Sequence, residues 1–218
     1  MTRPGPRVGP TGKAARAAKP NAPQHDKRPH EVRIVGGQWK RTRLAVADKP
    51  GLRPTPDRVR ETLFNWLASL AGAGGGELPG WHRVDAFAGT GVFGLEALSR
   101  GADHDSFLET DRAALAALRA NVAACREAER CAVLPADATR PPRASAPCGL
   151  VFLDPPYGRG LVEAALPALS AAGWIAPGAL VCAEVEAAAA APPPGFALVA
   201  ERAHGPARLL FLRPEAGA

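Results

Sequence analysis

Short apolar runs alternate with amphipathic segments over most of the chain after residue 81, a pattern typical of strands and helices that follow one another. The runs are rich in Val, Leu, Phe and Ala, as in strands buried on both faces of a sheet. The predicted strands are 82–87, 106–109, 131–134, 150–153, 179–184, 196–201 and 209–213. Three helices are predicted in the same region. One begins after residue 91, the second covers 111–127 and the third covers 161–171. This alternation predicts an α/β fold with a doubly wound parallel sheet that ends in an antiparallel pair.

The segment before this alternation predicts a β-hairpin and one helix. Residues 32–35 and 38–44 form two short apolar-polar runs around Gly36-Gly37, which is a turn signal. Thr55 is a good helix N-cap and Pro56 a good first helical residue. The apolar residues that follow recur at helical spacing on one face, namely Val59, Leu63, Trp66, Leu67 and Leu70.

Composition limits the chain to one sizeable domain with an appendage, because 218 residues are too few for two α/β domains. Residues 1–30 are rich in Pro, Gly, Ala, Lys and Arg, and we expect a disordered basic tail. We expect residues 31–75 to form the hairpin-and-helix unit and residues 76–218 the main domain. The four cysteines lack C-x-x-C spacing and the histidines lack zinc-ligand spacing, so we expect no metal site and reduced thiols. No secretory signal or transmembrane stretch is recognisable, which predicts a cytoplasmic protein.

Basic residues are concentrated in the first quarter of the chain. Residues 1–60 contain 15 Lys and Arg against 4 Asp and Glu, whereas the remainder contains 12 against 17. A basic segment on a mildly acidic body favours a polyanionic partner such as a nucleic acid. The candidate contacts are the hairpin residues Arg33, Trp39, Lys40, Arg41 and Arg43. The Trp39 ring would either stack on a base or anchor the hairpin by packing, and both readings stay open.

A glycine-rich turn follows the first strand of the main domain. Gly89-Thr90-Gly91-Val92-Phe93-Gly94 fits G-x-G-x-x-G, and Glu109 lies twenty residues after Gly89. This spacing also satisfies the dinucleotide fingerprint, so a nicotinamide-dependent oxidoreductase is one alternative. Asp85, just before the turn, would repel a pyrophosphate. It suits a cofactor with a cationic amino group, such as S-adenosylmethionine.

The fourth strand of the main domain ends in Asp154-Pro155-Pro156-Tyr157. Two prolines hold the backbone rigid and cannot continue a sheet ladder. The carboxylate and a proline carbonyl can together accept both hydrogens of an exocyclic amino group while an aromatic ring stacks on the base. The simpler reading is a stiff strand-to-helix turn, since Pro-Pro pairs are common in loops. Its place after a glycine-rich turn favours the chemical reading.

These motifs together resemble the family of bacterial 16S ribosomal RNA guanine-N2 methyltransferases. The resemblance runs from about residue 31 to the C-terminus and rests on the stretches 33–39, 53–55, 58–66, 85–91, 94–102 and 154–157. It implies a Rossmann-like sheet of seven strands whose last strand is antiparallel, preceded by the hairpin and a helix that caps the cofactor site. The chain departs from the family over residues 140–149, which are rich in proline.

The same resemblance implies roles for individual residues. Asp85, Gly89 and Gly91 would hold the methionine part of S-adenosylmethionine, Glu109 the ribose hydroxyls, and Asp137 would lie near the adenine. Arg53 and Thr55 match the part of the family's sequence pattern whose residues line the cofactor site. Asp154, Pro155, Pro156 and Tyr157 would hold the target guanine. The implied partner is 16S ribosomal RNA or an assembling small ribosomal subunit, and we expect a monomer.

Other functions use the same features. Adenine-N6 methylation of DNA and N5 methylation of protein glutamine need the same grip on an amino group, so residues 154–157 do not separate them from guanine methylation. The basic hairpin disfavours a glutamine substrate, and the 53–66 stretch favours ribosomal RNA over DNA. A non-catalytic RNA-binding assembly factor is a further alternative, against which the intact glycine turn and amino-holding motif count.

Overall fold

The structure, a computed structural model, describes residues 1, 31–47, 55–70, 72, 81–156, 158–186, 192–204 and 207–215. Almost all of the predicted tail (1–30), most of the glycine-rich segment before the first strand of the main domain (71–80) and residues 187–191 lie outside the described residues. Within those that are described, none of the helices is both long and apolar enough to span a bilayer.

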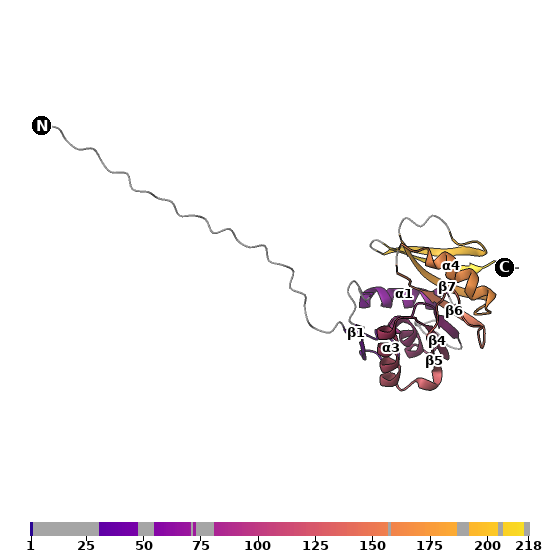
Figure 1. The fold of residues 1–218 in the computed structure, drawn as a ribbon, viewed down its shortest axis with the longest axis horizontal. Helices are drawn as coiled ribbons and strands as arrows, with labels where there is room; N and C mark the ends of the chain where they lie inside the picture. Colours follow the sequence, from indigo (N-terminus) through magenta and orange to yellow (C-terminus); the bar gives the residue numbers. More distant parts are fainter. Residues whose placement is uncertain are drawn as a thin grey trace.

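The chain alternates strands and helices along the sequence (Figure 1). The elements are β1 (Glu31–Arg33), β2 (Arg43–Ala45), α1 (Asp57–Leu70), β3 (His82–Asp85), α2 (Val92–Ser99), β4 (His104–Leu108), α3 (Arg112–Cys125), the 3-10 turn η2 (Ala128–Arg130), β5 (Cys131–Leu134), β6 (Cys148–Leu153), α4 (Leu161–Ala171), β7 (Ile175–Glu186), β8 (Phe196–His204) and β9 (Ala207–Pro214).

Seven strands form one mixed sheet in the order β5-β4-β3-β6-β7-β9-β8. The five strands from β5 to β7 are parallel, and β9 lies antiparallel between β7 and β8. The predicted doubly wound sheet with an antiparallel last strand is thereby confirmed. The chain reverses its direction of travel across the sheet between β3 and β6, so the crevice at their carboxyl ends is where ligands bind in such folds.

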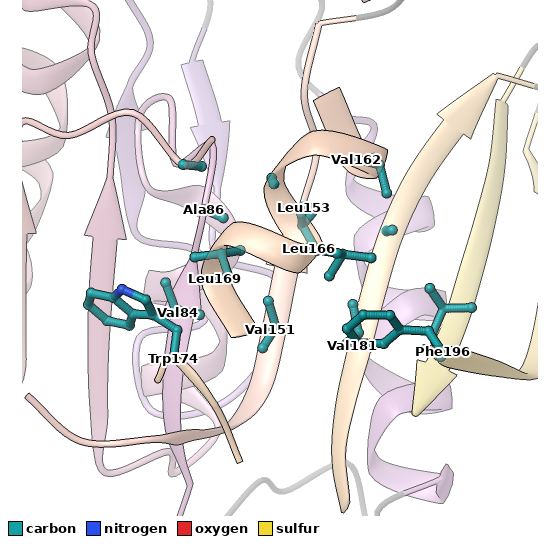
Figure 2. Packing of buried hydrophobic residues seen from close by; sticks show 14 of the residues in the cluster. Val84, Ala86, Val151, Leu153, Val162, Leu166, Leu169, Trp174, Val181 and Phe196 are labelled. Carbon is teal, nitrogen blue, oxygen red and sulfur yellow. The ribbon is translucent and has the colours of Figure 1, made fainter. Parts of the chain in front are cut away.

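The two faces of the sheet bury separate apolar clusters. One face packs against α4, as Figure 2 shows for Val151, Leu153 and Val181 of the sheet opposite Leu166 and Leu169 of the helix. The opposite face contacts α1 and α2 through a cluster that includes Leu67, Phe93 and Phe152. Since side chains alternate between faces along a strand, the register decides which residues reach each cluster.

A proline-rich loop covers part of the α4 face beside that helix. The indole N–H of Trp174 donates a hydrogen bond of 2.8 Å to the Pro142 carbonyl, and the Ala144 N–H donates one of 2.9 Å to the Ala172 carbonyl. Trp174 itself is 2% exposed and belongs to the α4 cluster. The stretch in which the sequence departs from the family is therefore packed against the domain by the indole of Trp174.

The N-terminal hairpin is shorter than predicted. We expected strands over 32–35 and 38–44, but only residues 31–33 and 43–45 pair. The connecting loop bonds instead to α2: the Val35 N–H donates to the Glu96 carboxylate at 2.7 Å, and the Trp39 N–H donates to Ser99 Oγ at 3.0 Å. Backbone groups satisfied by another element do not need a ladder, so the strands end early.

The hairpin is tied to both neighbouring helices. The side chain of Asn121 on α3 accepts from the Ala45 N–H at 2.8 Å and donates to the Ala45 and Thr90 carbonyls at 2.9 Å each. The fully buried Arg60 on α1 donates to the Arg33 carbonyl and pairs with Asp57 at 2.9 Å. The hairpin is thus part of the domain that carries the glycine turn.

Gly37 makes the contact between hairpin and α2 possible. Its φ is 71°, in the left-handed region, and a methyl group on its Cα would overlap the Ser99 carbonyl. Gly173 provides a matched control, because its φ is 80° and a methyl group there meets nothing within 4 Å.

We predict that Gly37→Ala lowers the free energy of unfolding by about 2–4 kcal/mol, through left-handed strain plus displacement of α2. Gly173→Ala should cost only the strain, roughly 1–2 kcal/mol. Urea unfolding of both variants measures the difference. Equal losses would contradict the assigned contact.

Candidate active site

Acidic residues follow the parallel strands at the carboxyl edge of the sheet. Asp137 comes after β5, Glu109 after β4, the turn 89–94 after β3, and Asp154 after β6. Glu184 lies near the end of β7. Because the sheet order is β5-β4-β3-β6-β7, these groups form one row in the order given. Asp137 is therefore the member of the row farthest along the sheet from residues 154–157, the predicted target-base motif, and Glu184 is next to that motif.

The glycines of the turn have two different roles. Gly89 has a φ of 53°, and a methyl group on its Cα would meet nothing within 4 Å. Gly91 has a φ of 78°, and a methyl group there would overlap the Leu118 side chain on α3. The absence of a side chain at Gly91 therefore lets α3 pack closely against the turn, whereas Gly89 leaves an open space above the turn.

Glu109 holds the turn from the neighbouring strand. One carboxylate oxygen accepts from the Gly89 N–H at 2.8 Å, and the other accepts from the N–H groups of Thr110 and Asp111 at 2.7 Å each. The oxygen bonded to the Gly89 N–H keeps a further lone pair for a ligand hydroxyl, whereas both lone pairs of the other oxygen are used. Asp137 is exposed, and hydrogen bonds from the Thr139 N–H and hydroxyl, both 2.8 Å, lower its pKa.

Asp85 lies beneath the turn and is 1% exposed. Burial raises its pKa well above the usual range, and the neighbouring Asp105 charge raises it further. Asp105 forms a buried ion pair with Arg83, which also donates a 2.9 Å hydrogen bond to the Gly94 carbonyl. Among the described residues, Asp85 Oδ2 is buried and has no hydrogen-bond partner. A buried acceptor without a partner is costly unless a ligand or water satisfies it.

Asp154 lies one residue beyond the end of β6 and is half-buried. Its pKa is raised to about 7, first by burial and then by the charge of Glu184. Its charge also contributes to the raised pKa values of Asp85 and of the buried Cys182 thiol. Asp154 is thus close to both the turn and the end of β7, and it forms no ion pair with any residue that the structure describes.

A cavity of about 300 Å³ opens beside Pro155, the residue that follows Asp154. Its wall consists of Pro155 and Pro156, the 158–163 segment that leads into α4, and residues 184–186 of β7. A purine base is flat and smaller than this volume. The rigid Pro-Pro segment places a carbonyl without a competing proline N–H at the wall, as the amino-holding hypothesis requires.

The predicted RNA-binding residues of the hairpin differ in their environments. Lys40, Arg41 and Arg43 are exposed, and Arg41 has a left-handed φ of 75°. The exposed Arg33 pairs with Asp57 at 2.8 Å. Trp39 is half-buried and packs against the cluster between α2 and α3. The structure therefore shows the packing contact for Trp39, while stacking on a base stays a prediction.

Two of the predicted site residues, Arg53 and Tyr157, lie outside the described residues. Thr55 is half-buried before α1, and its carbonyl accepts a 2.5 Å hydrogen bond from Arg60. The helix begins at Asp57, one residue later than the predicted Pro56. Sequence reasoning missed Glu184 and Asn121, although Glu184 comes directly after the apolar run 179–183.

A seven-stranded sheet with an antiparallel strand inserted before its edge, an open glycine turn at the switch point and acids along the carboxyl edge together define a Rossmann-like methyltransferase that uses S-adenosylmethionine. The residues fit this cofactor in two ways. Space is open above Gly89, and the partnerless oxygen of Asp85 suits a cationic amino group.

Comparison with known proteins gives the family. A family described as "Conserved hypothetical protein 95" matches residues 32–213. Ribosomal RNA small subunit methyltransferase D of Escherichia coli K12 is 42% identical over 156 residues, which cover 72% of this chain and 75% of that protein. The Haemophilus influenzae protein of the same name is 39% identical and covers 72% and 79%. A solved Escherichia coli structure named methyltransferase yhhF has a TM-score of 0.72 at 36% identity and covers 86% and 99%. The chain belongs to this family, that of ribosomal RNA small subunit methyltransferase D.

The two glycines give a prediction that separates cofactor binding from folding. Gly89→Ala should lower the affinity for S-adenosylmethionine at least 10-fold, because the added methyl group enters the open space, while unfolding changes by roughly 1–2 kcal/mol. Gly91→Ala should lose more stability, because its methyl group overlaps Leu118. Titration calorimetry and urea unfolding measure both effects. Unchanged cofactor affinity in Gly89→Ala would contradict the placement of the cofactor.

Proposed function

We propose that the protein transfers the methyl group of S-adenosylmethionine to the exocyclic N2 amino group of a guanine in 16S ribosomal RNA. The observation that supports this most is the position of Asp154, whose charge acts on Asp85 before the glycine turn and whose next residue, Pro155, lies at the wall of a base-sized cavity. The names of the relatives supply the small-subunit ribosomal RNA. We take the enzyme to act on this RNA in the cytoplasm and as a monomer.

The row of groups at the carboxyl edge suggests how the cofactor lies. In this proposal, Asp137 is next to the adenine, Glu109 accepts from the ribose hydroxyls, and Asp85, Gly89 and Gly91 hold the methionine end. Arg53 and Thr55, which precede α1 in the sequence, would close the site. Asp85 acts from below the turn, where its buried oxygen accepts from the ammonium group.

The chemistry follows from charge and position. The bound cofactor supplies an electrophilic methyl group on a sulfonium. Asp154 and the Pro155 carbonyl accept the two N2 hydrogens of the guanine, which holds the nitrogen lone pair toward that methyl group. The carboxylate also stabilises the positive charge that grows on the nitrogen. As the C–N bond forms and the sulfur–methyl bond breaks, leaving a thioether, the N–H would become acidic, and Asp154 or water would accept its proton.

Pro156 keeps the backbone after Asp154 rigid, and Tyr157 is proposed to stack on the base. The target base must leave its own stack to reach the cavity, which costs least in a loop or in an unassembled RNA. The exposed cations Lys40, Arg41 and Arg43 of the hairpin would bind the RNA backbone nearby. Arg33 and Trp39 would contribute from the same hairpin, Trp39 chiefly by supporting it from beneath.

Nucleoside mass spectrometry of 16S ribosomal RNA tests the substrate. Deletion of the gene should remove one N2-methylguanosine, and the purified protein should restore it on RNA or subunits from the deletion strain. Retention of every N2-methylguanosine in that strain would refute the proposed substrate.

Asp154→Asn tests the catalytic role. We predict a loss of kcat of roughly 100-fold or more with the affinity for S-adenosylmethionine unchanged, because the amide retains only one acceptor and no charge. In the wild type, kcat/KM should fall as the pH drops through about 7, since protonation of Asp154 removes the same charge and acceptor. The falling limb should be absent in the variant.

Asp103→Asn is a matched control, because Asp103 is exposed just before β4, at the opposite edge of the sheet. It should show the wild-type rate and pH profile. Wild-type turnover by Asp154→Asn would refute the catalytic assignment.

A further inference from the structure

A second carboxylate lies beside Asp154, and the register of the sheet places it there. β6 and β7 are parallel, with Phe152 paired to Cys182 and Leu153 paired to Ala183. The residues that follow this last pair are Asp154, one position past the end of β6, and Glu184, which is still within β7. Neighbouring strands are about 4.8 Å apart, so carboxylates at paired positions can converge on one ligand.

The two side chains also share a face of the sheet. Phe152 and Cys182 belong to the cluster under α1, whereas Leu153 and Ala183 belong to the cluster under α4. Because direction alternates along a strand, Asp154 and Glu184 point to the same side as Phe152 and Cys182. Glu184 is half-buried and lines the cavity with Pro155 and Pro156.

The edge of guanine offers what two adjacent acceptors need. Guanine presents N1–H beside the N2 amino group, so it has donors at two neighbouring positions. Adenine presents an amino group beside an N1 acceptor, which would face the lone pairs of a carboxylate. A single acid that holds the amino group, as described for Asp154, does not distinguish these bases.

We propose that Glu184 is the specificity-determining residue of the target-base site, where it accepts the guanine N1–H while Asp154 holds the N2 amino group. The proposal rests on guanine-N2 methylation and adds the group that selects guanine over bases with an acceptor at position 1. Glu184 does not receive the methyl group and need not move a proton in the reaction.

The electrostatics of the pair agree with this role. Burial and then the charge of Glu184 raise the pKa of Asp154 to about 7, and the charge of Asp154 in turn raises the pKa values of Asp85 and the Cys182 thiol. Two like charges that face each other are costly until donors lie between them. The N1–H and N2–H donors of guanine offset that repulsion, whereas the N1 lone pair of another base increases it.

The experiment compares two RNA substrates that differ only at N1 and at the C6 oxygen of the target base. One is the ribosomal RNA fragment with guanosine at the mapped position, and the other has 2-aminopurine there, which keeps the 2-amino group and lacks N1–H. Methyl transfer to each is measured as kcat/KM for the wild type, Glu184→Gln and Glu184→Ala. Glu129→Gln, an exposed carboxylate on η2, is the charge-matched control.

We expect the wild type and Glu129→Gln to favour guanosine by roughly 10- to 100-fold, the usual range for a paired base-edge contact. Glu184→Gln should narrow this ratio at least 10-fold, because its amide N–H can donate to the N1 of 2-aminopurine. Glu184→Ala should lose activity on guanosine RNA and gain activity on 2-aminopurine RNA, because no carboxylate then faces the N1 lone pair. The ratio is independent of the fraction of each variant that is folded.

Two results would overturn the proposal. One is equal use of both RNAs by the wild type, and the other is a guanosine preference that survives in both Glu184 variants. Failure of the wild type to methylate guanosine RNA and ribosomal subunits alike would instead refute the proposed function itself.

Discussion

Electrostatic repulsion between two acids at the carboxyl ends of β6 and β7 is the constraint on which the proposed site depends. Asp154 and Glu184 each directly follow the last pair of the β6–β7 ladder, which is Leu153 with Ala183. Each is half-buried, and the charge of Glu184 raises the pKa of Asp154 beyond the effect of burial. Two neighbouring carboxylates lower the folding stability and create a negative electrostatic potential. That potential suits a reaction in which positive charge moves from a sulfonium to an amine.

The other contacts of the domain keep this edge in place. Glu109 ties the glycine turn to β4, and Asn121 ties the same turn to the hairpin through Thr90 and Ala45. Arg83 and Asp85 contact Gly94 from the strand below it. Through these bonds the hairpin, which carries the exposed cations, has a fixed position relative to the turn. A nucleic acid bound by the hairpin would therefore meet the cavity in a defined orientation.

The sequence predicted the strands and the turn because their signals are local. Asp154 was recognisable since an apolar run, an acid and two prolines follow one another. Glu184 was missed because it ends an apolar run in an alanine-rich stretch, and its partner lies thirty residues away on the next strand. Pairing between strands is not local, so no window of sequence reveals it.

The other differences between the predicted and the observed elements also arise from contacts between residues that are distant in the sequence. β7 begins at Ile175, four residues before the predicted start, because Pro177 and Gly178 interrupt the apolar pattern where the ladder shifts register between Cys148 and Leu150. The hairpin strands are shorter than predicted because Ser99 and Glu96 on α2 take the backbone bonds. Trp39 was ambiguous until α2 and α3 supplied its packing surface.

The most direct test of this account is the titration of the Asp154 carboxyl carbon by NMR in protein labelled with ¹³C at aspartate. The Asp154 signal is assigned from its absence in Asp154→Asn. The account predicts a midpoint near pH 7 that moves lower in Glu184→Gln, because burial persists and the repelling charge is removed. A midpoint near 3.9, the ordinary value for aspartate, or one unchanged by loss of the Glu184 charge, would contradict it.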